Sequence, residues 1–350
     1  MSINHTTGIS SSKDAEIAEP PADSISSLCF SPNADLLAVG SWDNYIRVYE
    51  VASNLMSRGV AMSAHQGPVL GVCWNKDGTR ILSGGADNLA RVFDVQTGQS
   101  SQVAAHDAPV KSVRWIESHQ GGILVTGSWD KTVKYWDLRS PHPAGIVPLP
   151  ERCYSLDAAY PLMVVGTADR HIQSFDLRNP MSPLISSLSP LKWQTRVVSC
   201  FYSGTGFAVG SIEGRVAMHH MDQTNAANNY TFRCHRQDTK QNTVMESQVY
   251  AVNDITFHPV HQGTFATCGS DGTVTFWEKD SRTRLKSLEP CPGPVTSVRF
   301  NRNGTVLAYA VSYDWSRGYS YMKTGYPNKI MLHTCLDAEV QRKSRFPKGR

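Results

Sequence analysis

Two histidine–aspartate pairs in this 350-residue chain have the residue types of acid/base partners. His65 precedes Asp87, His106 precedes Asp130, and Ser128 lies two residues before the second acid. A histidine that takes a proton from a serine, with a carboxylate to orient its ring, is the arrangement of nucleophilic hydrolysis. However, the same grouping occurs twice in similar surroundings, which is hard to reconcile with a unique active site.

A second group could be considered for a metal ion. His219, His220, Cys234 and His235 lie close in sequence, but their spacing matches no standard zinc pattern and the chain has no Cys-x-x-Cys. The glycine-rich segment GTGFAVG at Gly204 lacks the lysine and the following helix of a phosphate-binding loop. We therefore expect no catalytic residue, no metal and no cofactor.

These residues recur because the chain contains seven copies of one phrase. Each copy has an alternating apolar strand, a small-residue pair, an acid, and a second strand that often closes on an aromatic residue and an acid. The copies begin at Ser24, Val69, Val110, Cys153, Val197, Val252 and Val295. A period of roughly 40 to 45 residues with a Trp-Asp-like ending is typical of WD repeats, which each form one four-stranded blade. The sequence therefore predicts an all-β, seven-bladed WD-repeat β-propeller.

An acid recurs at the turn between the second and third strands of every copy. These acids are Asp43, Asp87, Asp130, Asp169, Glu213, Asp271 and Asp314, of which only the fifth is not aspartate. An aspartate there can hydrogen-bond its own backbone and hold a tight turn. In such repeats the histidine, a Ser or Thr, the turn Asp and an aromatic residue form a brace inside one blade; His106, Thr126, Asp130 and Trp136 fit it. We therefore expect structural roles for these residues.

The seventh copy is interrupted by a long aromatic and basic loop. The segment SYDWSRGYSYMKTGYPN separates Val311 from a third strand expected near Lys329 to Thr334. A loop of this length in a compact repeat is more often functional than incidental. Blade seven then lacks an outer strand, which the stretch around Asp14 to Pro20 can supply and so close the ring. We predict a flexible tail at 1–13, one propeller over 14–336 and a basic tail at 337–350.

Charge and cysteine content indicate the class of protein. The net charge is +4, but the last nine residues, RKSRFPKGR, hold five basic groups, so the body of the chain is near neutral. No run of about 18 apolar residues and no charged-then-apolar leader is present, so neither a membrane span nor a secretory signal is expected. The eight cysteines favour buried reduced thiols and a nuclear or cytosolic protein. The composition of residues 237–247 suggests disorder.

Over nearly its full length the chain resembles the WD-repeat mRNA export factors of the nuclear pore, the Rae/Gle family. The resemblance rests on SPNADLLAVGSWDNYIRVYEV at Ser31, VGTADRHIQSFDLRNP at Val165, LKWQTRVVSCF at Leu191, EGRVAMHH at Glu213, FRCHR at Phe232, VYAVNDITFHPVHQGTFATCGSDGTVTFWEKD at Val249 and YDWSRG at Tyr313. It implies a non-enzymatic scaffold that supports nuclear export of poly(A) mRNA. It also implies a location in the nucleus, at the nuclear envelope and its pore complex, and in the cytoplasm.

The resemblance also implies a partner and a binding site. Members of this family bind the Gle-binding sequence of a Gly-Leu-Phe-Gly nucleoporin, a hairpin that places glutamates against propeller arginines. The motif match gives Arg196 in KWQTR and Arg215 in EGRVA, and the surrounding basic cluster adds Arg233 and Arg236. A guanidinium can hold a carboxylate through two parallel hydrogen bonds. We expect a monomer, or a heterodimer with the nucleoporin, that joins mRNA export complexes.

The YDWSRG loop is a second expected surface. Trp315 and Arg317 are of the types enriched at binding hot spots. In this family the corresponding loop is implicated in contacts that viral export inhibitors exploit. Tyr319 and Lys323 add a stacking face and a charge suited to single-stranded RNA. The simpler alternative is that Trp315 only covers the rim of the propeller, and the residues leave direct RNA contact open.

Three other functions remain open at this point. A mitotic checkpoint propeller, a paralogue that binds the same motif in checkpoint kinases, shares the arginine motifs, whereas FRCHR and YDWSRG favour the export factor. A substrate adaptor of a ubiquitin ligase would need a ligase-binding motif outside the blades, and none is visible in the tails. A direct RNA binder would show affinity that falls steeply with salt. A role at the mitotic spindle is left undecided.

Overall fold

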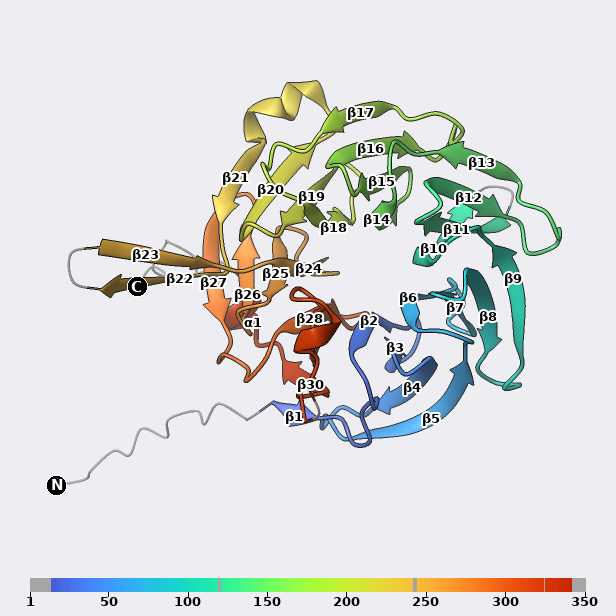
Figure 1. Ribbon diagram of the computed structural model, residues 1–350, viewed down its shortest axis with the longest axis horizontal. Coiled ribbons are helices and arrows are strands. Elements are labelled where there is room, and N and C mark those ends of the chain that lie inside the picture. Colours follow the sequence, from blue (N-terminus) through green and yellow to red (C-terminus); the bar gives the residue numbers. More distant parts are fainter. Residues whose placement is uncertain (1–13, 119–120, 242–243, 324, 342–350) are drawn as a thin grey trace, which may run out of the picture.

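The computed structural model describes residues 14–118, 121–241, 244–323 and 325–341. The predicted tail at 1–13 and the basic residues 342–350 lie outside this range. Seven four-stranded antiparallel sheets stand around a central axis, as Figure 1 shows. The predicted seven-bladed propeller is therefore confirmed.

The first four blades follow one another along the chain. Blade one comprises β2 (Ile25–Phe30), β3 (Leu36–Ser41), β4 (Tyr45–Val51) and β5 (Ser57–Ala64). Blade two comprises β6 (Val69–Trp74), β7 (Arg80–Gly85), β8 (Leu89–Asp94) and β9 (Ser100–Ala105). Blade three comprises β10 (Val110–Ser118), β11 (Gly121–Ser128), β12 (Thr132–Trp136) and β13 (Gly145–Pro148). Blade four comprises β14 (Cys153–Ala159), β15 (Leu162–Thr167), β16 (His171–Asp176) and β17 (Ile185–Leu188).

The last three blades complete the ring. Blade five comprises β18 (Thr195–Cys200), β19 (Gly206–Ser211), β20 (Arg215–His220) and β21 (Tyr230–Arg233), with the 3-10 helix η1 (Gln223–Asn228) between the last two. Blade six comprises β24 (Val252–Phe257), β25 (Thr264–Gly269), β26 (Val274–Glu278) and β27 (Thr283–Ser287). Blade seven comprises β28 (Val295–Phe300), β29 (Val306–Val311), β30 (Lys329–Thr334) and β1 (Ala15–Glu16), with η2 (Tyr319–Tyr321) in its long loop.

The N-terminal strand closes the ring as predicted. Ala15 pairs with Leu332 and Glu16 with Met331, so β1 is the outer strand of blade seven. Ile17 follows with only 1% of its surface exposed. Apolar burial and backbone pairing therefore hold the chain ends of the propeller together and cover an otherwise open edge.

Small residues in the second strands let neighbouring blades pack closely. A Cβ atom on Gly84 would lie 2.6 Å from Val110 Cγ1, and one on Gly127 would lie 2.5 Å from Cys153 Sγ. Val110 and Cys153 are the first residues of the next inner strands, β10 and β14. The small-residue pair noted in each repeat thus makes room for the following blade, and the buried clusters extend between adjacent blades.

Each of the seven inner strands carries a β-bulge at its second residue. The register shifts between the first and third residues of β2, β6, β10, β14, β18, β24 and β28. A bulged residue leaves the ladder, and its side chain is re-aimed. The bulged residues are Ser26, Leu70, Lys111, Tyr154, Arg196, Asn253 and Thr296, which we call the bulge ring.

Two segments differ from the sequence-based expectation. Residues 237–247 were expected to be disordered, but β22 (Arg236–Gln241) and β23 (Val244–Val249) form an antiparallel hairpin that extends outward from the ring (Figure 1). This expectation was wrong because paired strands satisfy their backbone hydrogen bonds whatever their polarity. At the other end, the helix α1 (Asp337–Val340) lies within the predicted tail, yet Val340 is buried and its carbonyl accepts a 2.6 Å hydrogen bond from Thr264 Oγ1.

The described part of the chain contains no helix long and apolar enough to cross a membrane. All eight cysteines are free, and six of them are buried. Burial raises the pKa of the Cys73 thiol to about 12, so this thiol stays protonated at neutral pH.

Candidate partner-binding face

The turn acids lie on one face of the ring, which we call the upper face; the inner strands begin there. In six blades the turn aspartate accepts a hydrogen bond from the backbone N–H two residues later, as in the 3.0 Å bond from Thr132 N to Asp130 Oδ1. The structural role predicted for these acids is confirmed. Glu213 accepts a 2.9 Å bond from the backbone N–H of Lys192, and Asp43, Asp87 and Asp130 accept equivalent bonds from Ala22, Gln66 and Asp107.

The histidine–aspartate pairs are parts of braces inside single blades. His106 contacts Asp130 at 2.7 Å and Thr126 at 2.7 Å, and Trp136 Nε1 donates to the same threonine at 2.8 Å. Burial lowers the pKa of His106, although Asp130 opposes the shift. His65 makes the corresponding contacts with Asp87 and Ser83. The polar atoms of each brace hydrogen-bond to one another, so these residues do not form an active site.

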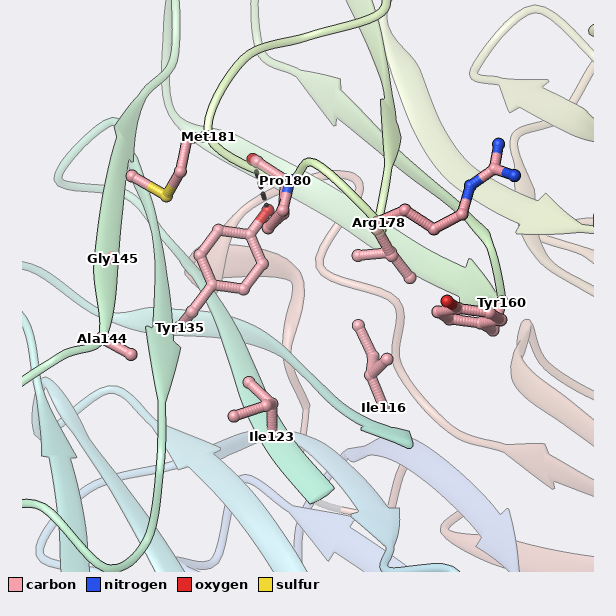
Figure 2. A pocket seen from close by; sticks show the side chains of 10 residues that line it. Ile116, Ile123, Tyr135, Ala144, Gly145, Tyr160, Arg178, Pro180 and Met181 are labelled. Carbon is pink, nitrogen blue, oxygen red and sulfur yellow. Dashed lines mark hydrogen bonds between the residues drawn. The ribbon is translucent and has the colours of Figure 1, made fainter. Parts of the chain in front are cut away.

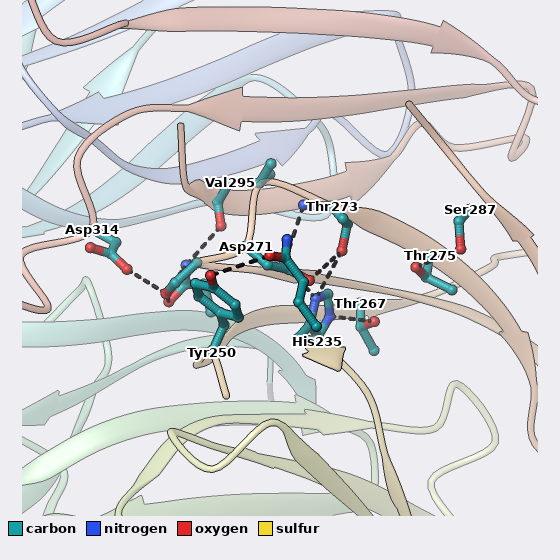
Figure 3. A network of polar contacts seen from close by, with 12 residues as sticks. His235, Tyr250, Thr267, Asp271, Thr273, Thr275, Ser287, Val295 and Asp314 are labelled. Carbon is teal, nitrogen blue, oxygen red and sulfur yellow. Dashed lines mark hydrogen bonds and ion pairs between the residues drawn. The ribbon is translucent and has the colours of Figure 1, made fainter. Parts of the chain in front are cut away.

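His235 forms a third brace, which the sequence analysis missed. Figure 3 shows its ring between Asp271 at 2.9 Å and Thr267 at 2.9 Å. The brace histidines His65 and His106 stand four residues before their inner strands, whereas His235 stands 17 residues before Val252 because the β22–β23 hairpin intervenes. In the sequence, the one feature that could have indicated this brace was His235 itself, in the segment FRCHR. Among the described residues no cluster of histidines, cysteines and acids could hold a metal ion.

Three of the four predicted docking arginines lie together at the upper edge of blade five. Arg215 on β20 and Arg233 on β21 are paired across the two strands. Arg236 donates a 2.8 Å hydrogen bond from Nη2 to the carbonyl of Glu213. The Glu213 carboxylate lies 3.8 Å from Arg215 Nε, a long and partly exposed pair. Three arginines therefore gather at this edge, and the Glu213 carboxylate contacts one of them, Arg215.

Arg196 lies apart from this group, at the mouth of the central channel. It is the bulged residue of β18 and donates a 2.7 Å hydrogen bond from Nη2 to the carbonyl of Asp314, in the long loop of blade seven. Burial lowers the pKa of Arg196, although the Asp314 charge opposes this. The structure thus connects Arg196 with the second predicted surface more directly than with Arg215.

Trp315 is partly covered rather than free. Its ring stacks on Trp42 of blade one, with centroids 4.1 Å apart and planes at 22°, and it also contacts Tyr313. Its φ of 59° occupies the turn position that Gly214 and Gly272 fill in blades five and six. A bulky residue rarely adopts positive φ, so the stack compensates for backbone strain. Both expected roles, rim cover and contact residue, thus remain compatible with its place on the upper face.

The other predicted contact residues of this loop, Arg317, Tyr319 and Lys323, are exposed. The side chain of Tyr319 is 84% exposed, and Arg317 lies over the ring of Tyr321 at 5.8 Å. Arg317 and Lys323 line a cavity of about 430 Å³ between blades six and seven, next to Asp314. The loop therefore presents two cations and accessible rings on the same face as the arginines.

A further pocket that the sequence did not indicate lies between blades three and four. Figure 2 shows Tyr135, Ile116, Ile123 and Met181 around a mainly apolar space of about 410 Å³. Tyr135 donates a 3.1 Å hydrogen bond to the carbonyl of Pro180, which closes one side. None of the predicted site residues lies here.

Comparison with known proteins supports the fold in two regions. A model of the anaphase-promoting complex subunit 4 WD40 domain matches residues 28–118. A model of the WD domain, G-beta repeat, matches residues 239–278. Both models describe WD repeats, in agreement with the seven blades.

Full-length relatives place the chain in one family. It is 51% identical to the poly(A)+ RNA export protein of Schizosaccharomyces pombe, over 97% of this chain and 94% of that protein. It is 51% identical to the mRNA export factor GLE2 of Chaetomium thermophilum, over 94% and 92%, and 45% identical to Protein Rae1 of Drosophila melanogaster, over 93% and 94%. Export factors are not enzymes, which confirms the prediction of a non-enzymatic protein. The chain therefore belongs to the Rae1/Gle2 family of mRNA export factors.

Proposed function

We propose that this export factor docks on a nucleoporin hairpin through the arginines of its upper face and so supports export of poly(A) mRNA at the nuclear pore. The proposal rests on the arrangement of arginines at the upper edge of blade five. There Arg215 and Arg233 are paired across two strands, Arg236 bonds the backbone carbonyl of Glu213, and the Glu213 carboxylate lies 3.8 Å from Arg215 Nε. A partner that presents glutamates would supply the missing negative charge.

The exposure and the weak ion pair of Arg215 suit binding to a partner carboxylate. Its side chain is 29% exposed, and its only ion pair within the described residues is the 3.8 Å contact with Glu213. A partly exposed pair of that length contributes little to stability, so the guanidinium is available to a partner carboxylate. Bidentate pairing would then give both affinity and orientation.

Calorimetric titration with a synthetic Gle-binding hairpin tests this proposal. The double variant Arg215→Glu, Arg233→Glu should lose binding, because reversing a desolvated pair removes the attraction and adds like-charge repulsion. Truncating one side of such a pair typically costs about 2 to 5 kcal/mol, so a loss of roughly 30-fold or more is expected. Arg284→Glu, on the exposed strand β27, is the matched control and should bind normally. Equal binding by all three proteins would refute this docking site.

A second function, contact with single-stranded RNA, rests on the loop of blade seven. Tyr319 offers an exposed ring, and Arg317 and Lys323 offer charge beside it. Stacking of a base on an aromatic side chain is worth about 1 to 3 kcal/mol. Fluorescence anisotropy with an oligo(A) probe, in the absence of nucleoporin, should show affinity that falls with salt and weakens in Tyr319→Ala. A lack of binding at low salt would exclude direct contact with this probe.

We also propose that the protein acts in the nucleus, at the envelope and pore, and in the cytoplasm, as a monomer or as a heterodimer with the nucleoporin. Fluorescence microscopy of the tagged chain tests this directly. A rim signal that the Arg215→Glu, Arg233→Glu variant loses would link location to docking. A rim signal unchanged in that variant would show that another surface directs the protein to the envelope.

A further inference from the structure

The bulge ring encloses a small polar cavity on the propeller axis. All seven bulged residues line this cavity, whose volume is about 80 Å³. A second space of about 210 Å³ adjoins it, and Arg114 and Arg299 line both. The cavity therefore holds several water molecules or one small ion, but not a polypeptide segment.

Three side chains of the bulge ring form hydrogen bonds between neighbouring blades. Each donates a hydrogen bond to the carbonyl of the first residue of the next inner strand: Ser26 to Val69 at 2.5 Å, Asn253 to Val295 at 2.9 Å, and Thr296 to Ile25 at 2.7 Å. Side chains used in this way have little remaining capacity for a ligand. Leu70, the fourth member, is apolar.

The other three members come from consecutive blades and carry long side chains with unused donors. The Lys111 ammonium makes no hydrogen bond or ion pair with a group in the described part of the chain, and it lines the cavity. Arg196 uses one Nη atom on the carbonyl of Asp314. The ring of Tyr154 contacts the Arg152 guanidinium, which lies 5.8 Å from the ring centroid. Blades three, four and five thus present an ammonium, a phenol and a guanidinium to one small space.

Two acids lie near this group: Asp254 lines the same cavity, and Asp157 lines the adjoining one. Asp157 accepts a 2.8 Å bond from Arg114 Nε and another from the backbone N–H of Cys200. Asp254 accepts a 2.6 Å bond from Arg299 and further bonds from Ser297 and the backbone. Both carboxylates already have their own guanidinium and backbone donors. The cavity is therefore lined by four cations, Lys111, Arg114, Arg196 and Arg299, and by one acid, Asp254.

The electrostatics of Lys111 agree with this imbalance. Burial lowers the pKa of its ammonium, and the neighbouring Arg196 lowers it further, although the Asp254 charge opposes this. Some of the side chain remains accessible because the channel contains free space, although inner strands surround it on all sides. A bound anion would restore both the lost solvation and the charge balance.

We propose that the bulge ring binds a small tetrahedral oxyanion such as inorganic phosphate, held by Lys111, Arg196 and Tyr154. A tetrahedral anion presents acceptors in several directions, which matches donors that converge from three blades. Its size suits a cavity of about 80 Å³. This site is separate from the arginine edge of blade five and does not depend on the proposed nucleoporin docking.

Thermal unfolding of the full chain in phosphate tests the site. Phosphate should raise the melting temperature saturably, by about 2 °C or more, over chloride at equal ionic strength. Lys111→Met should abolish the increase, Tyr154→Phe should weaken phosphate binding severalfold, and the exposed control Lys76→Met should leave it unchanged. No nucleoporin peptide is present, so the result is independent of the docking experiment.

Melting temperatures in chloride and in sulfate distinguish a loss of phosphate binding from an effect of the substitution on folding. In chloride alone Lys111→Met should melt at a higher temperature than the native protein, because it removes an uncompensated buried charge. Sulfate, as a second tetrahedral anion, should act like phosphate. The proposal is overturned if phosphate produces no saturable shift in the native protein, or the same shift in Lys111→Met.

Discussion

Arg196 in blade five is hydrogen-bonded to the backbone of Asp314 in blade seven, from Nη2 to the carbonyl oxygen at 2.7 Å. The Asp314 side chain in turn bonds Ser270 of blade six and the hydroxyl of Ser316. Although burial raises the pKa of Asp314, these hydrogen bonds and the nearby Arg196 hold it below its ordinary value. The turn aspartate of the interrupted blade therefore connects three blades on the upper face.

Removing the Asp314 charge should therefore reduce the free energy of unfolding more than removing the charge of a more exposed turn aspartate. Asp314→Asn keeps the size of the side chain but weakens hydrogen bonds to a buried charged group, and we expect a loss of about 1 to 2 kcal/mol in the free energy of unfolding. Asp169→Asn, in a turn whose carboxylate is 37% exposed, is the matched control and should lose less. Urea unfolding of the two variants measures both, and equal losses would contradict the connecting role.

The brace of His235 should contribute strongly to stability. His235→Ala leaves Thr267 and Asp271 without their buried partner, and unsatisfied buried polar groups cost about 1 to 3 kcal/mol each. His171 also pairs with its turn acid, Asp169, but its side chain is 36% exposed. His171→Ala should therefore change the unfolding free energy by less than about 1 kcal/mol. Denaturant unfolding distinguishes them, and a small effect at His235 would argue against the brace.

The buried histidines also predict a dependence of stability on pH. Burial lowers the pKa of His65 and His106 in the folded protein below the ordinary value of 6.5. Their contribution is therefore fully present above pH 6.5 and is lost as the pH falls through their folded pKa values. The free energy of unfolding should decrease from pH 6.5 toward pH 5. This slope should be shallower in the variant His106→Gln.

His333 acts in the opposite sense. Burial lowers its pKa, but Asp14 and Glu339 at 2.7 and 3.1 Å outweigh this and raise it above 6.5. Its contribution is fully present below pH 6.5 and is lost as the pH rises through its folded value. His333→Gln should therefore destabilise the protein more at pH 6 than at pH 9. A pH-independent loss would mean that His333 is not charged in the fold.

The repeat pattern determined much of the fold in advance. The turn acids, the third strand Lys329–Thr334 and the closing strand near Asp14 all follow from local residue types at a fixed period, and all lie where expected. The β22–β23 hairpin, which begins at Arg236, interrupts that period and separates His235 from its inner strand, so the brace of His235 was not predicted. The strands of this hairpin are polar, and what stabilises them is backbone pairing, which composition does not reveal.

The candidate site was less accessible to sequence reasoning. Arg215 and Arg233 could be grouped because their strands are neighbours in one repeat. Arg196 and Lys111 could not, because their place depends on a bulge at the second residue of each inner strand, and no residue type marks it. The stacking of Trp315 on Trp42 likewise joins the last blade to the first, a contact that depends on closure of the ring.

The closing strand should be essential for stability. Ile17→Ala removes a side chain that is 1% exposed from the cluster between blades seven and one, and such truncations typically cost about 2 to 5 kcal/mol. Glu16→Ala, at a partly exposed ion pair with Lys329, is the control and should cost less than about 1 kcal/mol. Differential scanning calorimetry measures both. Similar melting temperatures for both variants would show that β1 is dispensable.

The Trp42–Trp315 stack should restrain the long loop of blade seven. Trp315 adopts a positive φ that its backbone does not favour, and the ring contact at 4.1 Å offsets the strain. Trp42→Ala removes that contact while leaving the loop sequence intact, so the loop should open more often. Limited trypsin digestion, followed by mass spectrometry, should then show faster cleavage after Arg317 and Lys323. Trp193→Ala, whose side chain is 62% exposed, is the matched control. If both variants are cleaved like the native protein, the stack does not hold the loop, and the place of Trp315 on the upper face must depend on Tyr313 and the Arg196–Asp314 bond instead.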